Sequence, residues 1–214
     1  MVIDSKPIIL LGGGGHALVC LDLLIRCKRQ IIGYVALTPS KQIEKQLIPF
    51  IGNELLPASY PPQDITLVNG VGWAVGSFRR QHLFEEMKRQ GYSFATLVHD
   101  HAVVAESVIL AEGAQVMAGA VVQAEASIGA NSVINTRASV DHESCIGDHT
   151  HVAPGVTLCG GIHVGNGVLI GAGSTVIQGI SIGERSVVGA GSVVVRNVPA
   201  DTLVVGLPAK ERTR

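Results

Sequence analysis

Aromatic residues are scarce in this chain, and so are charged ones: Phe, Trp and Tyr make up 4% of its 214 residues, and Asp, Glu, Lys and Arg make up 15%. Hydrophobic residues reach 47%, which argues against a disordered chain and allows a large core. With so few rings available, that core must be built from Val, Ile, Leu and Ala. Such side chains suit short strands stacked closely on one another.

Neither sign of charge dominates, since 16 basic residues face 17 acidic ones and no basic run occurs. This balance argues against a nucleic-acid-binding surface or an anionic membrane partner. Long hydrophobic runs are missing too: Pro7–Leu11 leads directly into glycines and is too short for a signal segment or a membrane span. We therefore expect a cytoplasmic protein without nucleic-acid or membrane partners.

The cysteines form no Cys-x-x-Cys pair, which argues against a disulfide scaffold or a thiolate zinc site. There are four of them, Cys20, Cys27, Cys145 and Cys159. The sequence predicts buried free thiols at these positions.

The second half of the chain has a period of six residues. Every sixth residue from position 104 to position 194 is Val, Ile or Leu, and a small or β-branched residue follows most of these anchors four places later. A period of six fits neither an amphipathic helix nor a heptad repeat. It fits a parallel β-helix in which each hexapeptide forms one short strand and one turn, and three hexapeptides complete a coil. Stacked coils would lie about 4.8 Å apart, the usual spacing of paired strands.

The first half of the chain predicts a small parallel α/β sheet of Rossmann-like character, because short apolar runs alternate with helical patterns. We expect two domains, residues 1–100 and 101–214, with a boundary near residues 99–103. The predicted strands are Pro7–Leu11, Ile31–Leu37, Ile65–Val71 and Tyr92–Val98, and the predicted helices are Ala17–Lys28 and Ser77–Gln90.

Five residues at the first strand-to-helix turn, Gly12–His16, could bind a phosphate. Glycines let a ligand approach the backbone, and the start of a helix offers free N–H groups and a partial positive charge. A purely steric need for glycine at a tight turn is the alternative. The dinucleotide pattern is incomplete, because Ala36 and Leu37 stand where an acidic residue is expected. A mononucleotide or nucleotide-sugar phosphate is therefore favoured over NAD.

Half of the eight histidines gather in the repeat, at His142, His149, His151 and His163. His142 follows its anchor by two places, which places it near a turn, and Asp141 and Glu143 flank it. A carboxylate that binds one ring nitrogen makes the other nitrogen a better base. Solvated surface histidines are the alternative. A zinc hydro-lyase is a second one, although His149 and His151 are expected on one strand and His142 on another side of the coil.

Three segments of the chain carry a resemblance to a known family. The segments NTRASVDHESCIGDHTHVAPGVTLCGG (135–161), GGGGHALV (12–19) and GLPAK (206–210) resemble the hexapeptide-repeat sugar acetyltransferases. Within them, the chain looks most like the UDP-4-amino-sugar N-acetyltransferases of bacillosamine-type pathways and their sialic acid O-acetyltransferase relatives. The similarity covers essentially the whole chain.

The resemblance implies a left-handed β-helix, a homotrimer, and acetyl-CoA as co-substrate without a metal. It implies that His142 is the general base for the 4-amino group of a UDP-linked sugar, and that Glu143 raises its basicity. The residues implied to line the acetyl-CoA groove between subunits are His151, Gly160, Ala172 and Ser181. Those implied to hold the nucleotide sugar are Gly14, Gly15, His16 and Gly72.

One departure affects specificity. The family carries acidic residues at the end of the second strand, where this chain has Ala36 and Leu37, so the base and sugar stay open. The acetyl acceptor could instead be a sialic acid hydroxyl or the amine of a GDP-linked sugar. A non-catalytic scaffold is a further alternative.

Overall fold

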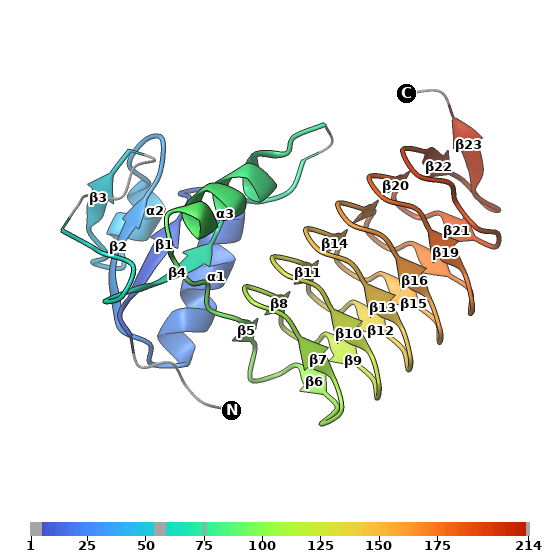
Figure 1. Ribbon diagram of the computed structural model, residues 1–214, viewed down its shortest axis with the longest axis horizontal. Helices are drawn as coiled ribbons and strands as arrows, with labels where there is room; N and C mark the ends of the chain where they lie inside the picture. Colours follow the sequence, from blue (N-terminus) through green and yellow to red (C-terminus); the bar gives the residue numbers. More distant parts are fainter. Residues whose placement is uncertain (1–5, 54–58, 75, 213–214) are drawn as a thin grey trace. The chain divides into compact units, whose positions relative to one another are not determined.

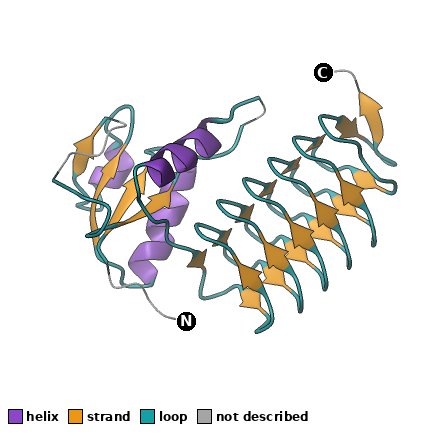
Figure 2. Cartoon of the chain, viewed as in Figure 1, coloured by secondary structure: helices purple, strands orange, loops and turns teal. Residues whose placement is uncertain are grey.

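The computed structural model describes residues 6–53, 59–74 and 76–212 (Figure 1). The chain divides into two compact units, Met1–Ala95 and Thr96–Arg214. All helices of the described residues belong to the first unit, and the second consists of strands and turns (Figure 2).

The first unit is built on a four-stranded sheet with the order β3-β2-β1-β4, in which all neighbours are parallel. Its strands are β1 (Ile8–Leu11), β2 (Ile31–Val35), β3 (Phe50–Gly52) and β4 (Thr66–Asn69), and its helices are α1 (Gly15–Arg26), α2 (Lys41–Glu44) and α3 (Arg79–Arg89). All four residues of β1 are buried, because this strand pairs on both edges with β2 and β4. The prediction of a small parallel α/β sheet is confirmed.

One local prediction in this unit needs correction, and two short elements were not predicted. Tyr92–Val98 is not a fourth strand of the sheet, because only Phe94 bridges to it, at Leu67, before the chain leaves. Leu97–Val98 instead forms β5, which pairs with a strand of the second unit. The elements α2 and β3 were not predicted, because each is too short to show a periodic pattern.

The second unit is a left-handed parallel β-helix with three faces. The hexapeptide period predicts the β-helix, and the family resemblance implies its left hand. The six-stranded face contains β6 (Val103–Val104), β9 (Val121–Val122), β12 (Ser139–Val140), β15 (Thr157–Leu158), β18 (Thr175–Val176) and β21 (Val193–Val194). The five-stranded face contains β7 (Ile109–Leu110), β10 (Ser127–Ile128), β13 (Cys145–Ile146), β16 (His163–Val164) and β19 (Ser181–Ile182). The eight-stranded face contains β5, β8 (Gln115–Val116), β11 (Val133–Ile134), β14 (His151–Val152), β17 (Leu169–Ile170), β20 (Val187–Val188), β22 (Leu203–Val205) and β23 (Lys210–Arg212).

The predicted anchor residues form the core of this prism. Each is the second residue of its strand and lies beside an anchor of the next coil, as Val140 does beside Leu158. Both are fully buried. Burying one such aliphatic side chain contributes roughly 1.5–3 kcal/mol, so the stacked anchors supply the main stabilising term. At the C-terminal end β23 runs antiparallel to β22.

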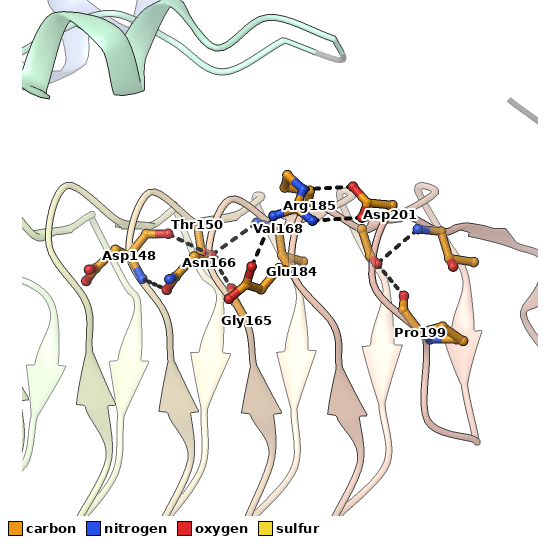
Figure 3. Close-up of polar contacts among 11 residues, drawn as sticks. Asp148, Thr150, Gly165, Asn166, Val168, Glu184, Arg185, Pro199 and Asp201 are labelled. Atoms are coloured by element: carbon orange, nitrogen blue, oxygen red, sulfur yellow. Dashed lines mark hydrogen bonds and ion pairs between the residues drawn. The ribbon is translucent and has the colours of Figure 1, made fainter.

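Where Ser or Thr stands four places after an anchor, its buried hydroxyl can satisfy backbone groups at a corner between two faces. The Thr150 hydroxyl donates to the Gly165 carbonyl at 2.8 Å and accepts the Val168 N–H at 3.2 Å (Figure 3). Ser132 makes the same two bonds one coil earlier. A buried polar group left without a partner costs about 1–3 kcal/mol, so a hydroxyl is well suited to this position.

One corner of the prism, between the five- and eight-stranded faces, has glycines where neighbouring coils approach most closely. These are Gly129, Gly147, Gly165 and Gly183. A Cβ at Gly129 would lie 2.5 Å from the carbonyl carbon of Gly147 and 2.6 Å from the backbone nitrogen of Asp148. Glycine at these four positions therefore avoids a clash between neighbouring coils.

We expect Gly129→Ala to lower the free energy of unfolding by about 3 kcal/mol, the upper range for overpacking, because backbone atoms must move apart. Denaturant unfolding measures the change. Gly155→Ala is the matched control: no atom lies within 4 Å of its Cβ position, and its φ of 68° leaves only a left-handed penalty of about 1 kcal/mol. Equal losses in the two variants would contradict the packing argument.

Candidate active site

The turn between β12 and β13 presents His142 on the outside of the prism. Its side chain is 59% exposed, and its Nδ1 lies 3.0 Å from Glu143 Oε2. Asp141 has a different role, because its Oδ1 accepts the backbone N–H of His142 at 2.8 Å. Of the two flanking carboxylates, the one that contacts the ring is therefore Glu143.

This contact determines which ring nitrogen of His142 carries the proton. An ionised carboxylate only accepts hydrogen bonds, so the proton of a neutral His142 ring lies on Nδ1 and is donated to Glu143. Nε2 then keeps its lone pair and can accept a proton. Glu143 itself adopts a left-handed backbone conformation, with φ of 57°, and the equivalent residues of the next two coils are Gly161 and Gly179.

Gly160, in the equivalent turn of the next coil, makes room for the imidazole. A Cβ at Gly160 would lie 2.6 Å from both Cε1 and Nε2 of His142. The two turns are also tied together, because the Gly161 N–H donates to the His142 carbonyl at 2.8 Å and the Ser144 hydroxyl donates to the Cys159 carbonyl at 3.2 Å. The packing of the ring on a glycine therefore fixes where Nε2 lies.

His151 begins β14 on the eight-stranded face, and its Nε2 lies 3.4 Å from Nδ2 of Asn135. Asn135 is held in turn, because its Oδ1 accepts the Thr136 N–H at 2.7 Å. Asn135 was not among the site residues predicted from the sequence. It stands seven residues before His142, at the start of the segment that carries the family resemblance, but an Asn in a turn is too common to be a signal.

The four residues implied to line the acetyl-CoA groove do not share one groove within a single chain. His151 lies on the eight-stranded face and Ser181 on the five-stranded face. Gly160 lies at the corner after β15, and Ala172 lies at the corner after β17. Ser181 also lines a cleft of about 510 Å³ on its own face, together with His163 and Asn197.

The first unit holds a larger cleft, of about 1080 Å³. It brings together the four residues implied to hold the nucleotide sugar, Gly14, Gly15, His16 and Gly72. Ala36 and Leu37 also line it, just beyond the end of β2.

The structure separates the two explanations for the glycines in this cleft. Gly12 is needed for close packing, because its Cβ would lie 3.0 Å from the carbonyl carbon of Gly70 and its φ is 110°. Gly14 and Gly15 have no atom within 4 Å of their Cβ positions. Gly14 is the N-cap of α1. Internal packing therefore does not explain Gly14 and Gly15, whereas a ligand seated on the helix terminus would.

The histidines of the zinc alternative do not come together within the described chain. His149 lies in a turn with φ of 56°, so it does not share a strand with His151, and it contacts Asn131 at 3.0 Å. Among the described residues, the group with three neighbouring metal-ligating side chains is instead the run 99–101, whose sequence is His-Asp-His.

The prediction that all four thiols are buried is wrong. Cys27 and Cys145 are exposed, and Cys159 is half-buried. Cys20 is buried on the inner side of α1, and this burial raises the pKa of its thiol to about 12. Cys27 lies at the end of a helix, where no periodic pattern applies. Cys145 directly precedes the anchor Ile146, so it lies on the outer side of its strand.

A hexapeptide β-helix with an outward histidine, together with a glycine-lined cleft on an α/β unit, defines a class of acyltransferase. Residues 7–87 match the PglD N-terminal domain, and residues 161–196 match the bacterial transferase hexapeptide (six repeats). None of the described helices has the length and apolar character needed to cross a membrane.

Solved structures agree over the whole chain. A histidine-to-asparagine variant of perosamine N-acetyltransferase from Caulobacter crescentus, in complex with CoA and GDP-perosamine, shares 34% identity over 98% of each chain, with a TM-score of 0.86. The acetyltransferase domain of PglB from Neisseria gonorrhoeae, in complex with acetyl coenzyme A, shares 29% identity over 97% of this chain and 99% of its own, with a TM-score of 0.89. The chain belongs to the hexapeptide-repeat sugar acetyltransferases, and it is an acetyltransferase.

Proposed function

We propose that this chain transfers the acetyl group of acetyl-CoA to the 4-amino group of a nucleotide-linked amino-deoxy sugar, with His142 as general base. The observation that carries the proposal is the exposed imidazole of His142, whose Nδ1 contacts Glu143 and whose Nε2 lies beside Gly160, so that Nε2 is the nitrogen left to accept a proton. The two relatives described above are crystallised with CoA or acetyl-CoA, which supports this co-substrate.

In the proposed reaction the neutral amine attacks the thioester carbonyl carbon, and a C–N bond forms. The carbonyl oxygen gains negative charge, which the backbone N–H at Gly160 stabilises by a hydrogen bond. Nε2 of His142 takes the proton from the nitrogen, the C–S bond breaks, and the proton passes to the departing CoA thiolate. Glu143 stabilises the imidazolium that forms in between. No covalent acetyl-enzyme is required.

The cleft of the first unit is the proposed nucleotide-sugar site, with the diphosphate on Gly14, Gly15 and His16 and with Gly72 opposite. The family resemblance implies a UDP-linked sugar, whereas the perosamine relative was crystallised with a GDP-linked one. Ala36 and Leu37 offer no charge to the base, so both nucleotides are candidates. Since both co-substrates are cytoplasmic metabolites, we place the reaction there.

A thiol-release assay with acetyl-CoA and a panel of acceptors tests the proposal. UDP- and GDP-linked 4-amino sugars should release free CoA, and a sialic acid should not. Release with the sialic acid alone would replace the proposal by O-acetyl transfer. Activity that disappears with a chelator and returns with zinc would favour the metal alternative. Absence of acetyl-CoA binding would favour a scaffold.

We further propose a homotrimer in which neighbouring subunits complete the acetyl-CoA groove. This is supported by the placement of His151 and Ser181 on different faces of one prism, because one chain cannot bring both into a single groove. Light scattering should give three times the chain mass of 22.3 kDa. A monomer with full activity would contradict the proposal.

A further inference from the structure

The helix α3 starts with two consecutive arginines that have different surroundings. Arg79 is exposed and lines the large cleft of the first unit, opposite the glycines that precede α1. Arg80 is 4% exposed and lies in the interior of the same unit. Neither residue was identified from the sequence, where this helix reads as polar.

The Arg80 side chain clamps the end of β4. Its Nη1 donates to the carbonyl oxygens of Asn69 and Val71, both at 2.8 Å. The clamp is reciprocal, because Nδ2 of Asn69 donates to the Arg80 carbonyl at 3.0 Å and Oδ1 of Asn69 accepts the Val71 N–H at 3.1 Å. Three of these hydrogen bonds attach the segment after β4 to the first turn of α3, and the fourth, between Asn69 and Val71, holds the segment itself.

That segment forms one wall of the cleft and touches the glycine turn on the other side. The Gly70 N–H donates to the Leu11 carbonyl at 2.7 Å, and a Cβ at Gly70 would lie 2.9 Å from Cα of Ala17 on α1. Gly72, two residues on, has the Cβ of His16 at 3.6 Å from its own Cβ position. The position of Arg80 therefore determines how the two walls face each other.

The buried guanidinium keeps its charge at neutral pH. Burial lowers the pKa of Arg80 only to about 10, which leaves the group protonated. The neighbouring Cys20 thiol, with its pKa raised by burial to about 12, stays neutral. The cleft is lined by two cationic side chains, Lys41 and Arg79, and by one carboxylate, Glu86, and the Arg80 guanidinium lies behind its wall. The excess of positive charge suits an anionic ligand.

We propose that Arg79 binds the diphosphate of the nucleotide sugar and that Arg80 is a positioning residue that holds the Asn69–Gly72 wall in register with the glycine turn. The inference rests on the proposed function, which supplies the diphosphate. A guanidinium matches phosphate oxygens with paired hydrogen bonds, which a lysine ammonium cannot reproduce.

Titration calorimetry with UDP and GDP tests the role of Arg79. We expect Arg79→Gln to weaken binding of the accepted diphosphate about tenfold to a hundredfold, and Arg79→Lys to weaken it less, while affinity for the phosphate-free nucleoside stays unchanged. Arg26→Gln is the matched control, because it removes an exposed arginine of the same unit at the far end of α1. Its affinity should equal that of the wild type.

Steady-state kinetics tests the role of Arg80. Arg80→Lys keeps the charge but cannot hold both carbonyls, so we expect KM for the nucleotide sugar to rise about tenfold while KM for acetyl-CoA and kcat stay within about twofold. Asn69→Ala removes the hydrogen bonds of the Asn69 side chain and should show the same rise in KM for the nucleotide sugar alone. This second variant tests the positioning role if Arg80→Lys does not fold.

The outcomes separate this inference from the function it rests on. If the wild type binds a diphosphate and Arg79→Gln binds it equally well, the role of Arg79 is refuted. If the kinetic variants raise both KM values alike, Arg80 is only a structural residue and its positioning role is refuted. If the wild type binds neither diphosphate, the proposed nucleotide-sugar function fails, and this inference fails with it.

Discussion

Replacing His142 by Ala is expected to lower kcat by about two to four orders of magnitude, the usual contribution of a general base. KM for acetyl-CoA should stay within about threefold, because the ring is assigned to proton transfer and not to uniform binding of the coenzyme. The exposed position of the side chain, 59% accessible, means that the substitution should not unfold the protein. Initial rates of thiol release at saturating acceptor measure the effect.

The matched control is His101→Ala, which removes a histidine that is 73% exposed on the same β-helix and has no role in the proposed site. It should retain full activity. A His142→Ala variant with a kcat near that of the wild type would show that another group accepts the proton. An equal loss in both variants would point to general damage to the prism.

Replacing Gly160 by Ala is expected to lower kcat about tenfold to a hundredfold, although no reacting group is removed. The added methyl would occupy the space of the ring, 2.6 Å from Cε1 and Nε2 of His142, so the imidazole must turn away. A displacement of about 1 Å in a catalytic group is enough for a loss of this size. Steady-state kinetics measures it, with circular dichroism as the check on folding.

Gly161→Ala separates this effect from backbone strain. Gly161 has φ of 65° and no atom within 4 Å of its Cβ position, so an alanine there costs about 1 kcal/mol of stability without touching the ring. The expected order of kcat is wild type, then Gly161→Ala slightly below it, then Gly160→Ala far below both. The reverse order of the two variants would contradict the assigned position of the imidazole.

The β-helix could be predicted from the sequence because each anchor repeats one local rule. Val140 and Leu158 are both apolar at the same step of the period, and the structure stacks them directly. The corner glycines after the five-stranded face recur at the same step of the repeat, at Gly129, Gly147, Gly165 and Gly183. In such a repeat, residues at the same step of successive coils are neighbours in the structure. The sequence pattern therefore predicts the tertiary contacts and leaves few alternative folds.

The α/β unit was less predictable, because its contacts are not periodic. The apolar run at Tyr92–Val98 has the composition of a strand, yet it leaves the sheet after one bridge from Phe94 to Leu67. The one strand in that segment, β5 (Leu97–Val98), pairs with β8 of the β-helix, so its place depends on where the β-helix begins. Arg80 was missed for a related reason: a buried arginine is recognisable only once the carbonyls of Asn69 and Val71 are known to face it.

At the candidate site, sequence patterns identified His142 but could not choose between Asp141 and Glu143. Both flank the histidine, and the choice depends on the backbone of the turn. The left-handed conformation of Glu143 accompanies the contact of its carboxylate with Nδ1, whereas Asp141 accepts the backbone N–H of His142. The contact between Gly160 and the ring joins residues of successive coils, so it also needed the coil geometry.

A single-turnover experiment tests the central claim most directly. Excess wild-type enzyme is mixed with acetyl-CoA and the accepted nucleotide amino sugar, and the reaction is quenched at successive times. Mass spectrometry then gives the masses of the protein and of the nucleotide sugar. Direct transfer with His142 as the base predicts that each free CoA appears together with one acetylated nucleotide sugar, and that the protein mass never changes. An acetyl group found on the protein before it reaches the sugar would contradict this account.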